Sequence, residues 1–241
     1  MAKHVLLNNI THKDLKVITQ HSARFGDNVG STLTFPTEFG DVQREYPILF
    51  RKDERSGKFQ SVVLLGLKPD ENLFLDEFSG WKANYIPAVI ERGPFLIGFQ
   101  DQSADGGPER APVVHLDVEH PRVNDSEGKA VFLEYGGMSP YLERINQLLQ
   151  RIYEGMQISD AMFEAFSALD LIEPVTLEIE INEREQYRLQ GNYTISAEKL
   201  AQLQGDDLLR LHRSGFLRCA YLAIESLGNV QRLIQLKNAR A

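Results

Sequence analysis

The residues best suited to chemistry form a short motif, His115-Leu116-Asp117, within the apolar run from Val113 to Val118. Because side chains alternate along a strand, His115 and Asp117 are expected on the same face. Non-haem iron oxygenases bind their metal with two histidines and one carboxylate, and His212 is a candidate for the distant third ligand. A metal-dependent oxygenase is therefore one hypothesis. The simpler interpretation is that these are ordinary half-buried polar residues.

The most unusual segment runs from Asn72 to Phe95 and combines aromatic residues, including the only tryptophan, with Pro87 and Pro94. Aromatic residues beside prolines build rigid apolar grooves for peptides or flat ligands. The same residues can instead pack inward and close one end of a sheet. An arginine in this segment would pair with a carboxylate, because its guanidinium fork matches that group. The candidate ligand-binding residues are Tyr46, Phe74, Trp81, Tyr85, Arg92 and Phe95.

Established catalytic motifs are missing from the sequence. It has no Gly-x-Gly-x-x-Gly or Walker-type phosphate loop, no Gly-x-Ser-x-Gly elbow and no His-Glu-x-x-His zinc motif. Two carboxylate pairs, Asp76-Glu77 and Glu178 with Glu180, are weak candidates for acid–base work, and the second pair faces away from the apolar side of its strand. These observations leave enzymatic activity open but favour a protein that is no enzyme and needs no cofactor.

The charge balance limits the partners. The 241 residues include 26 Lys and Arg against 34 Asp and Glu, a net charge of −8 at pH 7. Nucleic-acid binding without sequence preference requires clustered positive charge, so no nucleic-acid partner is expected. The locally basic stretch 210–240 is typical of a solvated helix face, or of a contact for an acidic partner. No apolar stretch approaches the ~18 residues that cross a bilayer, and the N-terminal apolar run is too short for a signal peptide. We therefore expect a cytoplasmic protein without membrane insertion.

Strand patterns are clear in two regions. Residues 46–120 are predicted to form an antiparallel sheet, from apolar runs at 46–50, 61–67, 94–99 and 112–118. One of the first two strands is expected to be buried on both faces. Strict alternation of apolar and polar residues from Val175 to Ile181 predicts one strand of a hairpin over 175–195. Gly191 marks a bulge or a close backbone approach in its second strand.

Helical patterns fill most of the remainder. Ser139-Pro140 is a typical helix start. The apolar stripe after it is expected to be interrupted at Gly155 and to resume at Ser159-Asp160. Further helices are predicted between Ser196 and Leu236, where the single cysteine, Cys219, is expected to be buried and inert.

These elements predict an α+β fold, with an antiparallel sheet core, several helices and a helix-rich C-terminal part. The glycine-rich stretch 25–40 is predicted to be a loop. We expect a single domain over residues 1–241, or two packed lobes. In the second case residues 1–125 would be rich in strands, and residues 126–241 would be mixed with a helical end.

Several short motifs carry a family resemblance. In chain order they are Glu38-Phe39, Tyr46-Pro47-Ile48-Leu49-Phe50, Leu64-Leu65-Gly66-Leu67, Asn72-Leu73-Phe74, Gly80-Trp81, Tyr85-Ile86-Pro87-Ala88, Arg92 and Pro94-Phe95, followed by Gly191-Asn192-Tyr193, Lys199-Leu200 and Ser226-Leu227. Over nearly the whole chain this order resembles the SapC family of bacterial proteins. Gly93 departs from the pattern, because members usually have an aromatic residue after the arginine.

The resemblance implies an accessory role. The family is named after gene clusters for export of surface-layer proteins. Many relatives lie beside genes for outer-membrane receptors, flavin-dependent halogenases and cupin-like oxygenases. The resemblance assigns no catalytic residue, and the sequence shows no protease constellation to match the peptidase labels of some relatives.

We therefore expect a non-catalytic accessory protein. It would hold a peptide, a protein or a small apolar or aromatic ligand at the aromatic surface centred on Trp81. The alternatives are the oxygenase at His115 and Asp117, and a structural protein that forms a homodimer through its amphipathic C-terminal helix.

Overall fold

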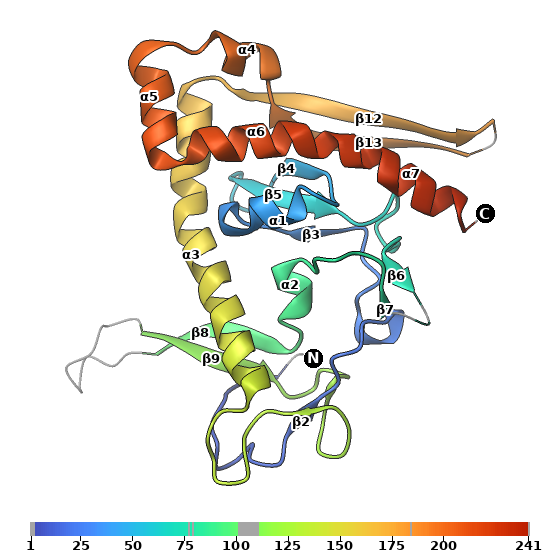
Figure 1. Cartoon of the computed structure of the whole chain (residues 1–241), viewed down its shortest axis with the longest axis vertical. Helices are drawn as coiled ribbons and strands as arrows, with labels where there is room; N and C mark the ends of the chain where they lie inside the picture. Colours follow the sequence, from blue (N-terminus) through green and yellow to red (C-terminus); the bar gives the residue numbers. More distant parts are fainter. Residues whose placement is uncertain (1–2, 77, 79, 101–110, 184, 241) are drawn as a thin grey trace. The chain divides into compact units, whose positions relative to one another are not determined.

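The largest sheet of the computed structural model is antiparallel, with the strand order β12-β13-β4-β5-β3 (Figure 1). The structure describes residues 3–76, 78, 80–100, 111–183 and 185–240. The chain groups into two compact units. The first unit contains Met1–Asp27 and Ala88–Tyr153, and the second contains Asn28–Pro87 and Glu154–Ala241. Antiparallel sheets together with helices make the fold α+β, which confirms the prediction.

The five-stranded sheet belongs to the second unit. Its first predicted pair is confirmed, because Ile48 lies opposite Val63 in an antiparallel register. Both strands of this pair contain runs of consecutive buried residues, so both faces are covered. The strands of the unit are β3 (Ser31–Leu33), β4 (Ile48–Lys52), β5 (Phe59–Leu64), β6 (Leu75–Asp76), β7 (Gly80–Trp81), β12 (Ile172–Asn182) and β13 (Glu185–Ile195).

The predicted hairpin is the pair β12–β13, and Gly191 lies at a bulge in it. Val175 is opposite Asn192, whereas Leu177 is opposite Leu189. An advance of two residues along β12 therefore corresponds to three residues along β13, and the extra residue forms a β-bulge. Gly191 has φ +74°, a left-handed conformation that glycine adopts at little cost.

The prediction of one loop over residues 25–40 is wrong in part. The stretch 25–40 is not a continuous loop, because it contains β3 and a short helical segment before α1 begins at Phe39. Cys219 is half-buried on a helix, and burial raises the pKa of its thiol to about 11. The helices are η2 (Pro36–Glu38), α1 (Phe39–Val42), α4 (Ala197–Gln202), α5 (Gly205–Ser214), α6 (Phe216–Ser226), η4 (Leu227–Asn229) and α7 (Val230–Asn238).

Helix α3 (Pro140–Ala168) runs through both units without a break. The interruption predicted at Gly155 is wrong. A Cβ atom at Gly155 would lie 2.4 Å from Cβ of Phe35 and 2.6 Å from Oγ1 of Thr37, so the glycine permits a close approach rather than a helix end. Among the described helices, none is both long enough and apolar enough to cross a membrane.

The first unit contains two small antiparallel sheets, in the orders β1-β9-β8 and β10-β2-β11. The predicted strands 94–99 and 112–118 are confirmed as the pair β8–β9. The single sheet predicted over residues 46–120 is wrong, because this pair belongs to a sheet separate from that of β4 and β5, in which β9 also pairs with β1. The elements are β1 (His4–Leu6), β2 (Lys16–Val17), η1 (Ala23–Phe25), α2 (Ala88–Glu91), β8 (Phe95–Gln100), β9 (Ala111–Asp117), β10 (Val123–Asn124) and β11 (Lys129–Ala130).

The two units interleave along the chain. The chain passes between them at 27/28, 87/88 and 153/154, whereas the lobes considered from the sequence meet at 125/126. The difference arises because β1 pairs with β9, and β13 pairs with β4. Each unit thus combines segments that are far apart in the chain.

Candidate ligand-binding site

Four of the six predicted ligand-binding residues form one aromatic cluster in the second unit. The ring centroids of Tyr46 and Phe74 lie 4.5 Å apart, and Phe74 stacks on Trp81 at 6.3 Å. Trp81 Nε1 donates to Tyr46 Oη over 2.8 Å, and this hydroxyl donates to the carbonyl of Tyr85 over 2.5 Å. Burial raises the pKa of the Tyr46 phenol well above its ordinary value. Tyr46 and Phe74 are fully buried, so only Trp81 and Tyr85 present any surface.

Two buried carboxylates hold this aromatic cluster in place. Tyr85 Oη donates to Glu38 Oε2 over 2.8 Å. Glu45 accepts the backbone N–H groups of Asn84 and Tyr85 and pairs with Arg232. Burial raises the pKa of Glu45, but these donors and the Arg232 charge outweigh it and leave the pKa below its ordinary value. The polar groups of the cluster thus bind one another, as expected where aromatic residues close the end of a core.

Arg92 and Phe95, the other two predicted residues, belong to the first unit. Phe95 begins β8, is fully buried, and contacts the Tyr141 ring edge-on at 6.0 Å between centroids. Arg92 follows α2, and its Nη1 donates to the carbonyl of Phe95 over 2.6 Å. The six predicted residues therefore fall into two groups, and a ligand-binding role for the Trp81 group stays a prediction.

The predicted metal ligands are divided between the two units. His115 and Asp117 lie on β9 in the first unit, whereas His212 lies exposed on α5 in the second. A Cβ atom at Gly98 would lie 2.3 Å from the His115 ring, so this ring packs closely over β8. Asp117 Oδ1 accepts the backbone N–H of Lys3 over 2.9 Å. Among the described residues, no group of three His, Cys, Asp or Glu side chains is arranged to hold a metal ion. Of the Asp76-Glu77 pair, Glu77 lies outside the described residues.

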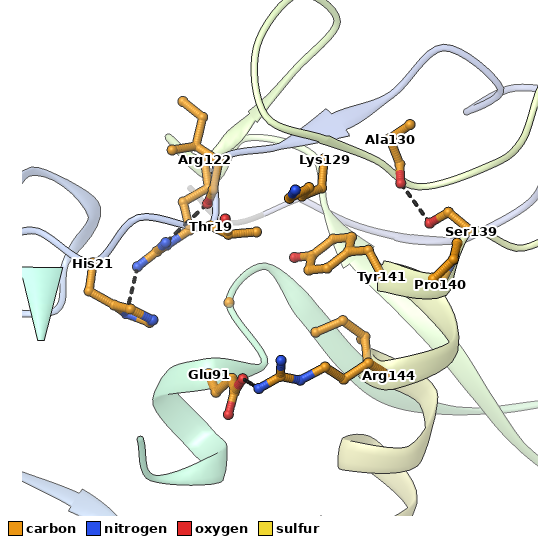
Figure 2. Close-up of a pocket in the computed structure, with 13 residues that line it drawn as sticks. Thr19, His21, Glu91, Arg122, Lys129, Ala130, Ser139, Pro140, Tyr141 and Arg144 are labelled. Atoms are coloured by element: carbon orange, nitrogen blue, oxygen red, sulfur yellow. Dashed lines mark hydrogen bonds and ion pairs between the residues drawn. The ribbon is translucent and has the colours of Figure 1, made fainter. Parts of the chain in front are cut away.

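A cavity of about 570 Å³ lies in the first unit, at the start of α3 (Figure 2). Sequence analysis did not find it. Its local signal was the Ser139-Pro140 helix start, which places Tyr141 and Arg144 on the first turns of α3. The cavity is lined by Ile18, Thr19, His21, Glu91, Gly93, Arg122, Lys129, Ala130, Ser139, Pro140, Tyr141, Arg144 and Ile145.

Arg122 is a buried arginine in the wall of this cavity. It is only 3% exposed, and its Nη2 donates to Asp27 Oδ2 over 2.5 Å. Its Nη1 donates to the carbonyls of Ile18 and Gln20. Burial raises the pKa of Asp27, but hydrogen bonds from His21 and a backbone N–H, together with the Arg122 charge, leave it below its ordinary value. Arg122 is therefore a charged part of the wall, and both of its terminal nitrogens are hydrogen-bonded.

Other polar groups at the cavity have no such partners. Figure 2 shows Tyr141 between Lys129 and the pair formed by Arg144 and Glu91, with the Tyr141 hydroxyl pointing toward Thr19. Within the described part of the chain, neither the Tyr141 hydroxyl nor the Lys129 ammonium forms a hydrogen bond or ion pair. Burial raises the pKa of Tyr141, so the hydroxyl keeps its proton and can donate. The cavity thus offers two unengaged donors.

The arrangement suits binding better than nucleophilic chemistry. Ser139 Oγ donates to the carbonyl of Ala130 over 2.6 Å, so its hydroxyl is not activated by a histidine. Apolar wall is supplied by Ile18, Pro140 and Ile145. A molecule with an acceptor oxygen at one end and an apolar body would satisfy both parts of this wall.

Comparison with known proteins gives one match. The family model described as SapC matches residues 7–233 of the 241-residue chain. No curated protein and no solved structure shows a significant match.

Proposed function

Since the chain belongs to the SapC family, with its family model matching residues 7–233, we propose that it is a non-catalytic accessory protein that binds a small molecule in the cavity of the first unit. The observation that carries this proposal is the pair of unengaged donors, Tyr141 Oη and Lys129 Nζ, beside the fixed Arg122. Tyr141 is half-buried, and buried or half-buried hydroxyls normally have partners, so this open donor at a cavity indicates a ligand. Lys129 is exposed and adds a positive charge to the cavity wall.

The size and charge of the cavity support one class of ligand. Its volume of about 570 Å³ lies within the range of ~300–1,000 Å³ typical of small-molecule sites. Arg122 is neutralised by Asp27, and Arg144 by Glu91, so Lys129 contributes the remaining positive charge. The proposed ligand is a small organic molecule with one acidic or strongly accepting group and an apolar body.

A protein partner at the aromatic segment is the second candidate. Phe78, between β6 and β7, is 95% exposed close to Trp81 in the chain, and aromatic residues are enriched in protein–protein interfaces. Such a partner would contact Phe78 and the exposed part of Trp81. Phe78→Ser would then abolish its binding, whereas Tyr141→Phe would leave it unchanged.

Native mass spectrometry of the full-length protein, purified from its own host, tests the first candidate. We expect a co-purifying small molecule of stoichiometric amount. Tyr141→Phe should weaken its binding about two- to tenfold, as expected for one neutral hydrogen bond, and Lys129→Gln should weaken it at least as much. Tyr135→Phe is the matched control, because Tyr135 is 95% exposed in the same unit.

Two results would contradict the proposal. One is a ligand that binds equally well to the wild type and to Tyr141→Phe and Lys129→Gln. The other is a protein that carries no molecule and gains no thermal stability from any of a panel of aromatic and aliphatic acids. A bound ligand at one hundred times its Kd stabilises a protein by about 2.7 kcal/mol, which a melting curve resolves.

A further inference from the structure

A second, smaller cavity of about 270 Å³ lies in the first unit. It shares Gly93 and Arg122 with the larger cavity, but its other charged and titratable groups differ. They are His4, Asp27, Arg92, Asp117 and His120.

The two arginines of this smaller cavity have opposite environments. Arg122 pairs with Asp27 at 2.5 Å. Arg92 instead makes a single hydrogen bond, from Nη1 to the carbonyl of Phe95, and has no carboxylate partner in the part of the chain that the structure describes. A guanidinium has five N–H donors, so the Nε edge of its fork stays unengaged. Burial lowers the pKa of Arg92, yet the group stays protonated.

An unpaired, largely buried charge is costly for a folded protein. Asp117 also lines the cavity, but within the described residues it forms no ion pair with Arg92, and its Oδ1 accepts the backbone N–H groups of Lys3 and Glu119. An arginine that lies unpaired beside a cavity is therefore suited to bind an anionic ligand.

His120 provides a second donor. Its Nδ1 accepts the backbone N–H of Arg122 at 3.2 Å, which leaves Nε2 as the protonated nitrogen of the neutral ring. Burial and the nearby arginines lower the pKa of His120, so the ring is neutral at pH 7. A neutral donor adds a hydrogen bond without adding charge.

From these contacts we propose that the smaller cavity binds a monocarboxylate, with Arg92 holding its two oxygens through the free edge of the guanidinium. A singly charged, planar group is favoured over phosphate, because Asp27 and Asp117 also face the cavity and would repel a second negative charge. Binding here does not require a ligand in the larger cavity, although the two cavities share Gly93 and Arg122.

Titration of the full-length protein with propionate, followed in ¹H–¹⁵N spectra, tests this site. We expect the amide signals of Gly93 and Phe95 to shift and saturate, and inorganic phosphate at equal ionic strength to bind more weakly. Arg92→Gln should weaken propionate binding at least about tenfold, the loss expected for a charge-assisted pair. Arg92→Lys, which keeps the charge without the fork, should also weaken it.

Two controls separate this site from other effects. Lys13→Gln removes an exposed positive charge in the same unit, at a residue that lines neither cavity, and should leave propionate binding unchanged. Tyr141→Phe should also leave it unchanged, so failure of this proposal and failure of the proposed function are distinguishable. The absence of saturable shifts in the wild type, tighter binding of phosphate, or unchanged affinity in Arg92→Lys would each overturn the proposal, even if Arg92→Gln fails to fold.

Discussion

Asp27→Asn is the most informative test of the wall that both cavities share. The substitution keeps an oxygen that can accept the backbone N–H of Ser22 but removes the negative charge beside Arg122. Arg122 is 3% exposed and keeps the carbonyls of Ile18 and Gln20 as acceptors of its Nη1, and its Nη2 lies 3.3 Å from Nδ1 of His21. Breaking a buried ion pair costs about 3–5 kcal/mol. We expect the lower end, about 3 kcal/mol, because these acceptors remain.

The pH dependence of this loss has a definite sign. The pKa of Asp27 in the folded protein lies below its ordinary value of 3.8. The pair therefore contributes its full stability well above pH 3.8, the ordinary value. It loses this stability as the pH falls from there through the lower pKa of the folded state, because the unfolded chain takes up the proton first. The difference in unfolding free energy between the wild type and Asp27→Asn should be largest near pH 7 and shrink toward pH 3.

Urea unfolding at a series of pH values measures this difference directly. Asp14→Asn is the control, since Asp14 is exposed and only loosely paired with Lys13 at 3.9 Å, and it should change stability by less than about 0.5 kcal/mol. The double variant with Arg122→Met should recover part of the loss, because no unpaired charge then remains. A single variant as stable as the wild type at pH 7, or a difference that grows toward pH 3, would refute the reasoning.

Three further predictions follow from other parts of the chain. Gly155→Ala should destabilise the protein by about 2 kcal/mol in chemical denaturation, because overpacking against Phe35 at 2.4 Å outweighs the helix-propensity gain of about 1 kcal/mol. Gly228→Ala is the control and should be neutral, because the added Cβ meets open space. A Gly155→Ala variant more stable than the wild type would contradict the close approach. Cys219, whose pKa is raised to about 11, should react with iodoacetamide at pH 7.5 far more slowly than the same thiol in urea, and equal rates would show that it is not protected. If two copies meet through α6, Tyr221→Glu should lower the mass measured by light scattering from dimer to monomer, because Tyr221 is 49% exposed on that helix; an unchanged dimer would place the contact elsewhere.

Elements with a local signature were predictable from the sequence. The hairpin β12–β13 was found because alternation over seven residues fixes which side chains share a face, and Gly191 disturbed the register as expected. The missed elements lack such a signature. Strand β3 has three residues, too few for a period, and it forms because β5 offers it an edge.

The candidate cavities depended on contacts that periodicity does not report. Asp27 and Arg122 are 95 positions apart, and nothing in either local pattern indicates that they pair. Arg92 was proposed to bind a carboxylate from its residue type alone. Among the residues that the structure describes it has no acidic partner, and this environment and its place at a cavity are properties of the tertiary fold. Gly155 was misinterpreted for the opposite reason. Glycine weakens a helix locally, so a break was predicted, but in the structure this glycine allows close packing against Phe35 within a continuous helix.

The interleaving of the two units has a consequence for how the chain folds. Tyr193 on β13 pairs with Phe50 on β4, a separation of 193 − 50 = 143 positions, so the five-stranded sheet is complete only after most of the chain is available. Closing so long a loop is entropically expensive and slows folding. During synthesis, β4 would wait with one edge unpaired, an open template for association with other chains. The hydrogen-bonded edge of β4 is therefore where a chaperone, or a misfolded neighbour, would compete with β13.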